Sequence, residues 1–153
     1  MKNIIITLLF PIIGLSQETL IKQLPENINT NNAELNFIQT NDSTAYFTVI
    51  SEINSKIESH IYTTNFINGE WGKKTYTKYN SDVLNTANIS FLEGGRTFFT
   101  ICNNEMLDCK IVYLEQNTKQ EFYEVPIIFA DQFLNTQAVI NKHNSQTVLY
   151  FVS

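Results

Sequence analysis

Short runs of alternating apolar and polar residues, separated by polar turns, recur along most of this chain. The clearest example is the stretch 85–114, NTANISFLEGGRTFFTICNNEMLDCKIVYL. Strand-like segments at 87–92, 97–102 and 109–114 are separated there by a turn with two glycines and by a polar turn at 103–108. Alternation with a period of two between turn signals is typical of a meander of antiparallel strands. The pattern therefore predicts an all-β fold.

The same pattern is found on both sides of this stretch. Before it, we expect a tight Asn68-Gly69 hairpin and four strands, at 33–38, 45–53, 60–66 and 70–76. After it, one strand completes the second set and two strands begin a third, at 120–125, 137–141 and 147–152. The chain therefore reads as a repeat of about four strands per unit.

Matching residues give this repeat a register. The triplets Tyr46-Phe47-Thr48, Phe98-Phe99-Thr100 and Tyr150-Phe151-Val152 follow one another at intervals of 52 residues. Shorter matches lie 50 and 51 residues apart, namely Asn85-Thr86 with Asn135-Thr136, and Trp71 with Phe122. A period near 50 with four short strands per unit predicts the four-stranded antiparallel blades of a β-propeller. A Greek-key sandwich is the alternative.

The repeat divides the chain into about two and a half blades. Following a linker, we expect blade 1, blade 2 and the truncated start of blade 3, so that the segments are 17–32, 33–84, 85–134 and 135–153. Propellers close with about four to eight blades. We therefore expect an incomplete propeller, the amino-terminal part of a longer protein; the alternative is that several chains complete a ring.

The stretch Ala87–Thr100, ANISFLEGGRTFFT, resembles the repeat of TolB-like (WD40-like) bacterial β-propellers, approximately A-N-P-S-F-S-x-D-G-K-T-x-Y-F-T. Gly95 matches the turn glycine and Phe99 the tyrosine, whereas Gly94 stands where that family has an aspartate. Arg96 and Thr97 match the basic residue and the threonine that follow the turn glycine. Such repeats often precede a peptidoglycan-binding OmpA-like domain. The resemblance thus implies an envelope scaffold, although no OmpA-like segment is present here.

The amino end has the pattern of a signal peptide over residues 1–16. Lys2 supplies the positive charge, residues 4–13 the apolar core, and Gly14-Leu15-Ser16 the small-residue cleavage site. A buried amino-terminal strand is the alternative. We expect export to the periplasm, the outer-membrane surface or the cell surface, with no membrane-spanning segment after cleavage.

Net charge excludes two classes of partner. The chain carries a net charge of −5, and cleavage after residue 16 would leave nine basic against fifteen acidic side chains. An acidic surface argues against nucleic-acid binding and against electrostatic docking on an anionic membrane. We expect instead an envelope protein or a peptidoglycan-associated partner, with a glycan as a further candidate.

Cys102 and Cys109 end and begin two adjacent predicted strands, with six residues between them. Facing Cα atoms of antiparallel strands lie about 4.5 or 5.5 Å apart, which a disulfide accepts. Export to an oxidising compartment favours this bond. Unpaired thiols are one alternative. A metal site is the other, although no second pair of ligands lies nearby.

Candidate binding residues fall into two groups. Trp71, Tyr76 and Tyr79 are candidates for a sugar-stacking platform, although Trp71 also suits the core between blades. The turns 39–44 and 93–96, together with 103–108, are the other candidates, through Asp42, Glu93, Arg96, Glu105 and Asp108. For the acidic pair Glu105 and Asp108 we expect a solvated turn and not a calcium site.

The sequence predicts a binding or scaffolding module and not an enzyme. His60 and His143 are isolated in the sequence, and neither paired carboxylates nor a nucleophile motif predicts catalysis. We therefore expect no catalytic residue, no metal and no cofactor. A secreted carbohydrate-binding or hydrolytic propeller is the alternative.

Overall fold

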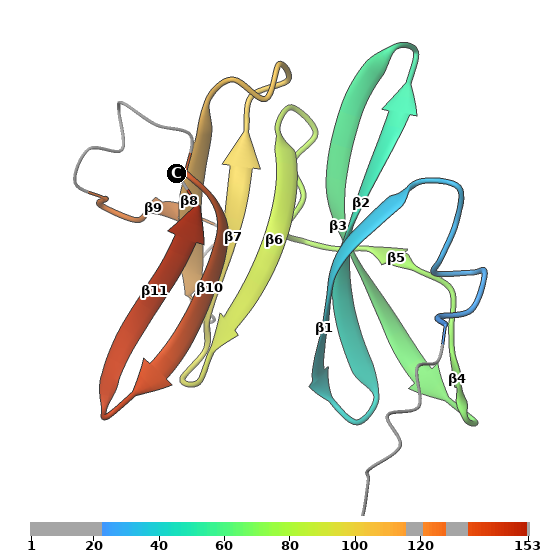
Figure 1. The fold of residues 1–153 in the computed structure, drawn as a ribbon, viewed down its shortest axis with the longest axis horizontal. Helices are drawn as coiled ribbons and strands as arrows, with labels where there is room; N and C mark the ends of the chain where they lie inside the picture. The colour runs from blue at the N-terminus through green and yellow to red at the C-terminus, as the bar shows by residue number, and fades with distance from the viewer. Residues whose placement is uncertain (1–22, 116–120, 128–134, 153) are drawn as a thin grey trace, which may run out of the picture.

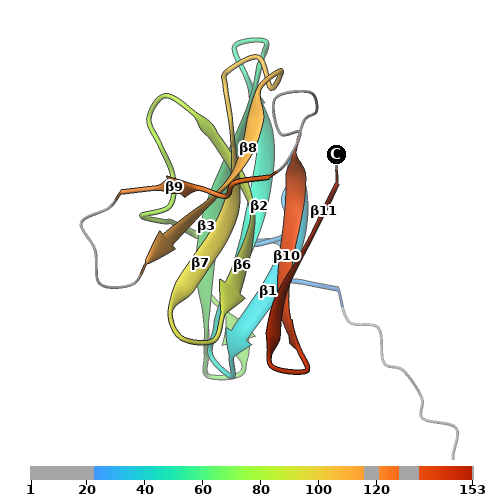
Figure 2. The ribbon, with the colours of Figure 1, turned by 90° about the vertical axis from the view of Figure 1, so that its left-hand side faces the viewer.

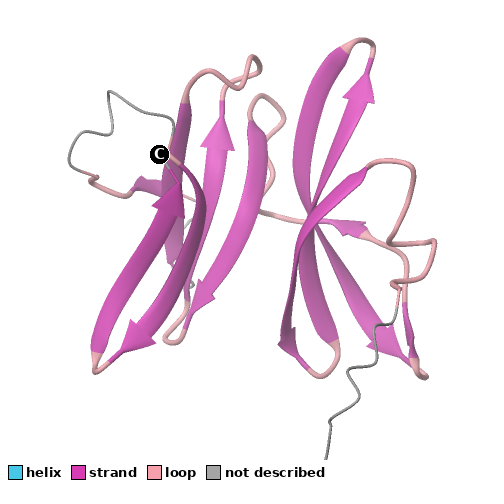
Figure 3. Ribbon diagram, viewed as in Figure 1, coloured by secondary structure: helices cyan, strands magenta, loops and turns pink. Residues whose placement is uncertain are grey.

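The computed structural model of the chain describes residues 23–115, 121–127 and 135–152. These residues form eleven strands and no helix, so the predicted all-β antiparallel fold is confirmed (Figure 3). The predicted signal peptide at 1–16 lies outside the described residues, as do parts of the predicted strand 120–125 and of the connector 127–134. In the part of the chain that the structure describes, no helix is long and apolar enough to cross a membrane.

The first sheet has five strands in the order β1-β2-β3-β4, with β5 also paired to β3. Its strands are β1 (Ala33–Asn41), β2 (Thr44–Ile53), β3 (Lys56–Ile67), β4 (Glu70–Trp71) and β5 (Thr75–Tyr76). The turn between β3 and β4 is the predicted Asn68-Gly69 hairpin. Both residues have positive φ angles, of 53° and 86°, which Asn and Gly tolerate best.

The second sheet has four strands in the order β6-β7-β8-β9, and a two-stranded hairpin follows it. The sheet contains β6 (Asn85–Leu92), β7 (Arg96–Cys102), β8 (Cys109–Glu115) and β9 (Tyr123–Glu124). The hairpin contains β10 (Thr136–His143) and β11 (Gln146–Val152). Figure 1 shows the two sheets and the hairpin side by side, with the second sheet between the other two.

The first strand of each group contains the same β-bulge. In β1, Asn36 and Phe37 stand opposite the single residue Phe47, because the pairing shifts between Leu35 and Ile38. The same two-against-one arrangement recurs at Asn88-Ile89 opposite Phe99, and at Gln137-Ala138 opposite Phe151. The first bulge residue has a positive φ in all three, 57°, 56° and 53°. The aromatic triplets thus occupy equivalent backbone positions in the three groups.

One face of the first sheet packs against the second sheet, and its other face packs against the residues that precede β1. Tyr46 and Ile61 of the first sheet contact a buried cluster that also contains Ile89, Phe99 and, from the second sheet's third strand, Val112 and Leu114. The opposite face of the first sheet carries Phe47 and Val49, which pack against Ile28. Ile28 is fully buried, so the carboxyl half of the predicted linker 17–32 packs onto the first sheet.

Side-chain hydrogen bonds also join the sheets. The Asn36 Nδ2 donates to Asn88 Oδ1 at 3.0 Å, which links two equivalent bulges. The backbone N–H of Asn88 donates to Thr48 Oγ1 at 2.9 Å, and that of Ile140 donates to Ser90 Oγ at 3.1 Å. These bonds fix how far each first strand lies along its neighbour.

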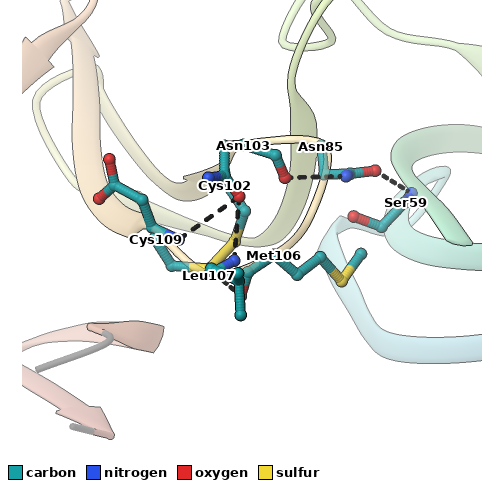
Figure 4. Close-up of a disulfide and its surroundings, with 8 residues drawn as sticks. Ser59, Asn85, Cys102, Asn103, Met106, Leu107 and Cys109 are labelled. Atoms are coloured by element: carbon teal, nitrogen blue, oxygen red, sulfur yellow. Dashed lines mark hydrogen bonds between the residues drawn. A yellow bond between two sulfur atoms is a disulfide. The ribbon is translucent and has the colours of Figure 1, made fainter.

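The disulfide predicted between Cys102 and Cys109 is confirmed. The two residues are direct partners at the end of the β7–β8 ladder, with Cα atoms 4.1 Å apart. The six-residue turn between them is closed from within, because Asn103 Oδ1 accepts hydrogen bonds from the backbone N–H groups of Leu107 and Asp108 (Figure 4). Asn85 fastens the turn to the first sheet, accepting from Ser59 N at 2.7 Å and donating to Asn103 O at 3.2 Å.

Two details of the predicted repeat are wrong. The segment 70–76 is two short strands and not one, because the pairing with β3 shifts by one residue between Trp71 and Thr75, where residues 72–74 stand opposite 64–65. The predicted match of Trp71 with Phe122 is also not a match of strand positions. Trp71 pairs with Phe66 in β4, whereas Phe122 precedes β9, whose ladder corresponds to that of β5.

Candidate binding cleft between the first two sheets

A cleft of about 610 Å³ opens between the two sheets. It lies at the end where β1 turns into β2 and β6 turns into β7, the lower end in Figure 1. Residues from both sheets and from the connector between them line it: Thr40, Tyr46, Lys78, Tyr79, Phe91, Leu92, Gly94, Gly95, Arg96, Thr97 and Leu114. Because each wall comes from a different sheet, the cleft exists only when the sheets stack.

Three aromatic rings form the floor of this cleft. The Tyr46 and Phe91 ring centroids are 4.8 Å apart, and Tyr79 lies 6.2 Å from Tyr46 and 6.5 Å from Phe91. Tyr79 is 7% exposed and packs on the buried ring of Phe99. Burial, together with the neighbouring Tyr79, raises the pKa of the Tyr46 hydroxyl. The floor is thus an aromatic surface on which the Tyr46 hydroxyl stays neutral at pH 7.

Lys78 places a positive charge at the rim, since its Nζ lies 5.5 Å from the centroid of Tyr79. Arg96 also lines the cleft, but its guanidinium lies on the other face of the second sheet, 5.5 Å from the Tyr113 centroid and with Nη2 3.0 Å from Glu115 Oε1. Tyr113 and Glu115 alternate along β8 with Leu114, which lines the cleft. A cation beside an aromatic ring suits a ligand that has both an apolar face and negative charge.

The predicted contact turns do not all lie at this end. Asp42 and Glu93 occupy the exposed β1–β2 and β6–β7 turns, at the cleft end of the sheets. Glu93 Oε2 lies 3.6 Å from Lys142 Nζ of the β10–β11 hairpin. The turn that holds Glu105 and Asp108 lies at the opposite end (Figure 1). One ligand at the cleft therefore reaches the first two turns and not the third.

Tyr76 belongs to a second, smaller pocket of about 240 Å³ near that opposite end. Its hydroxyl is 3.3 Å from His60 Nδ1, and His60 Nε2 is 3.6 Å from Glu58 Oε2. Burial raises the pKa of Tyr76, and the charges of Asp82, Tyr62 and Glu58 raise it further. The pocket is polar, with two carboxylates and one imidazole on its walls.

Trp71 lies in a third cleft, of about 600 Å³, on the face of the first sheet that points away from the second. Its ring is 5.3 Å from Phe37 and 5.1 Å from Phe66. The half-buried indole also packs against the cluster of Ile28, Phe47 and Val49. Trp71 thus serves the packing of this face while one side of its cleft stays open.

The predicted platform of Trp71, Tyr76 and Tyr79 is not assembled, because each ring lines a different pocket. Two of the predicted residues, Tyr79 and Arg96, do meet in one cleft. Sequence reasoning missed three groups that join them there, Tyr46, Lys78 and Phe91. Tyr46 belongs to the repeated triplets, so the repeat marks its position in the sequence. No regular spacing indicates that Lys78 and Phe91 line the same cleft.

Among the described residues, no group of three or more His, Cys, Asp or Glu side chains is arranged to hold a metal ion. A scan against protein-family models finds no match, and searches of curated proteins and of solved structures find no significant similarity.

Proposed function

We propose that this chain is a binding or scaffolding module of an exported bacterial envelope protein, built from β-propeller blades, and not an enzyme. The observation that carries the proposal is the recurrence of one bulged hairpin in three groups of strands that lie side by side (Figure 1). Stacked units of this kind are typical of propellers, which present loops and clefts from a rigid framework. The TolB-like pattern in 87–100 supports the assignment.

Export is supported by two independent features. The signal-peptide pattern at 1–16 directs the chain out of the cytoplasm. The Cys102–Cys109 disulfide suits an oxidising compartment such as the periplasm. A module of this class would meet envelope proteins or peptidoglycan as partners.

The cleft between the first two sheets is the proposed contact site. Its aromatic floor can stack on sugar rings, and Lys78 can attract a carboxylate. Peptidoglycan fragments combine both groups, because their glycan strands carry peptide carboxylates. Two acidic side chains near the cleft already form ion pairs within the fold, Glu115 with Arg96 and Glu93 with Lys142.

Co-sedimentation with purified peptidoglycan sacculi, and NMR titration with soluble muropeptides, test this function. We expect binding by the wild type, and weaker binding by Lys78→Ala by about fivefold or more, as for loss of one charge-assisted contact. Lys73→Ala is the matched control, since Lys73 is exposed outside the cleft. Equal binding by Lys78→Ala and Lys73→Ala would reject the cleft, and no binding by the wild type would reject peptidoglycan as partner.

A carbohydrate-binding or hydrolytic propeller is the second candidate, favoured by the exposed side of the Trp71 cleft. It predicts binding of neutral chitooligosaccharides that depends on Trp71 and not on Lys78. Release of reducing ends from such oligosaccharides would identify hydrolysis.

A further inference from the structure

The pocket of about 240 Å³ that contains Tyr76 lies near the end of the sheets opposite the candidate cleft. Its walls include Glu58 and His60 of β3, Tyr76 of β5, Asp82 of the connector before β6, and Asn104 of the β7–β8 turn. Figure 2 shows this connector, in light green, on the side of the molecule away from the β10–β11 hairpin. The pocket is therefore built by the first two groups of strands and not by the third.

The connector that carries Asp82 is fastened to the edge of β3 on both sides of this residue. Before it, the side chain of Asn80 accepts from the N–H of Ile61 and donates to the Ile61 carbonyl, both at 2.7 Å. After it, Asn85 Oδ1 accepts from Ser59 N, also at 2.7 Å. These hydrogen bonds fix both ends of the loop, so the pocket is part of the folded framework.

The pocket carries negative charge that this part of the chain does not neutralise. Glu58 and Asp82 are acidic, and no lysine or arginine of the described residues lines the pocket. Within the described ranges, Asp82 forms no ion pair, and Glu58 pairs only with His60, whose Nε2 lies 3.6 Å from Glu58 Oε2. Four other carboxylates do pair with a lysine or an arginine, namely those of Glu34, Glu93, Glu115 and Glu124.

Tyr76 gives the pocket an aromatic wall. Its ring centroid is 5.3 Å from that of His60, and the residue is 48% exposed. Carboxylates beside an aromatic ring are the groups that bind an ammonium or a guanidinium ion. A volume of about 240 Å³ lies below the roughly 300–1,000 Å³ of most small-molecule sites, so the pocket suits a single side chain.

Exposed apolar side chains lie beside this acidic pocket. Val83, on its wall, is 68% exposed, and Leu107, in the same turn as Asn104, is 69% exposed. These two are the most exposed large apolar side chains in the part of the chain that the structure describes. Exposed apolar groups around a charged pocket are typical of a surface that binds a protein segment.

We propose that this pocket receives a lysine or arginine side chain from a basic, partly apolar segment of a partner protein. The cation lies between Glu58 and Asp82 and beside the ring of Tyr76, while its apolar neighbours cover Val83 and Leu107. Charge complementarity selects this occupant, because the whole chain has a net charge of −5 and the pocket holds two carboxylates without a lysine or arginine partner among the described residues. The site is separate from the candidate cleft, so failure of either proposal leaves the other standing.

NMR titration of the chain produced in the periplasm tests this proposal with two short peptides. Acetyl-Leu-Lys-Leu-amide carries the cation, and acetyl-Leu-Gln-Leu-amide has the same apolar neighbours without it. We expect the lysine peptide to shift the resonances of Glu58, Tyr76 and Asp82 in a saturable way, and to bind about fivefold or more tightly than the glutamine peptide.

Substitution of one carboxylate locates the contact. Asp82→Asn should weaken binding of the lysine peptide by about fivefold or more. The matched control is Asp42→Asn, which removes the same charge from an exposed turn at the cleft end of the sheets. Both residues are exposed, so both variants should keep the fold, which near-UV circular dichroism checks.

A further comparison separates a protein segment from a free amine. n-Butylamine has the charge of a lysine side chain without the apolar neighbours, so we expect it to bind more weakly than the lysine peptide. Val83→Ser should weaken the peptide and leave n-butylamine unchanged.

The contrary results are equally definite. Lack of saturable shifts at the pocket, equal affinity for the two peptides, or equal effects of Asp82→Asn and Asp42→Asn would overturn the proposal. Binding of n-butylamine as tightly as the lysine peptide, or a peptide affinity unchanged by Val83→Ser, would overturn a protein segment as the occupant.

Discussion

Truncation of the phenylalanine in each second strand tests the repeated architecture at equivalent positions. Phe99 is fully buried, with Tyr79 and Phe122 rings at 5.7 and 5.2 Å. Replacing a buried Phe by Ala costs about 3–5 kcal/mol, partly through the cavity left behind. We therefore expect Phe99→Ala to lower the free energy of unfolding by about 4 kcal/mol.

The same substitution at the two equivalent positions, Phe47 and Phe151, gives the comparison. Phe47 is 1% exposed and packs against Phe37 and Tyr62, so Phe47→Ala should also cost about 4 kcal/mol. Phe151 is 39% exposed, so part of its surface is already in contact with water and a smaller cavity remains. For Phe151→Ala we expect about 1.5 kcal/mol, less than half of the other two losses.

Urea unfolding followed by far-UV circular dichroism measures these differences. With a slope of about 2 kcal/mol per molar, a loss of 4 kcal/mol moves the midpoint down by about 2 M. If a variant does not fold, the Phe→Leu series at the same positions should keep the same order with smaller losses.

A result with Phe151→Ala as costly as Phe99→Ala would refute this reasoning, since the positions would then be equally packed. A loss below about 1 kcal/mol for Phe47→Ala would refute the packing of the 23–32 segment on the first sheet.

Two further predictions concern the disulfide and the tyrosines. Replacing both Cys102 and Cys109 by Ser should lower the free energy of unfolding by about 2.5 kcal/mol, the chain-entropy value for a loop of this length. Urea unfolding of the variant, compared with oxidised and with reduced wild type, measures this loss. An unchanged midpoint in both comparisons would contradict it. Because burial raises the pKa of Tyr46 and Tyr76 in the folded state, their stabilising effect is complete below pH 10 and is lost as the pH rises through the raised values. Absorbance titration near 295 nm should therefore show two late tyrosines, and Tyr46→Phe and Tyr76→Phe should each remove one.

The repeat could be predicted from the sequence because it depends on local features. Aromatic triplets at a constant interval mark the second strands, and the Asn-Gly and Gly-Gly turns mark hairpins through positive φ angles. The disulfide followed from two cysteines that flank one turn. Each of these features involves residues close together in the chain, where period and turn chemistry decide the structure.

The candidate cleft could be predicted only in part, because it depends on how the sheets stack. Tyr79 and Arg96 meet there because the connector after β5 passes over the face of the second sheet. No period governs a connector, so the position of Lys78 could not be read from spacing. The same reason explains why Trp71 and Tyr76, five residues apart, line different pockets, since the pairing with β3 shifts by one residue between them.

Asn85 offers a test of the junction between the sheets. Its side chain is 4% exposed, accepts from Ser59 N at 2.7 Å and donates to Asn103 O at 3.2 Å (Figure 4). Asn85→Ala leaves both backbone groups without this partner, which costs about 2–3 kcal/mol. Asn85→Asp keeps the acceptor but turns a buried carboxylate toward the Asn103 carbonyl oxygen, so it should be the more destabilising variant at pH 7.

Acid should rescue the Asn85→Asp variant in part. The protonated carboxyl can donate to Asn103 O, so the folded state binds this proton more tightly than the unfolded chain does. The free energy of unfolding of Asn85→Asp, relative to Asn85→Ala, should therefore rise as the pH falls from 7 toward 4. Urea unfolding of both variants across this range measures the difference. A constant difference would show that Asn103 O does not depend on a donor at this position, and that the junction is held by apolar packing alone.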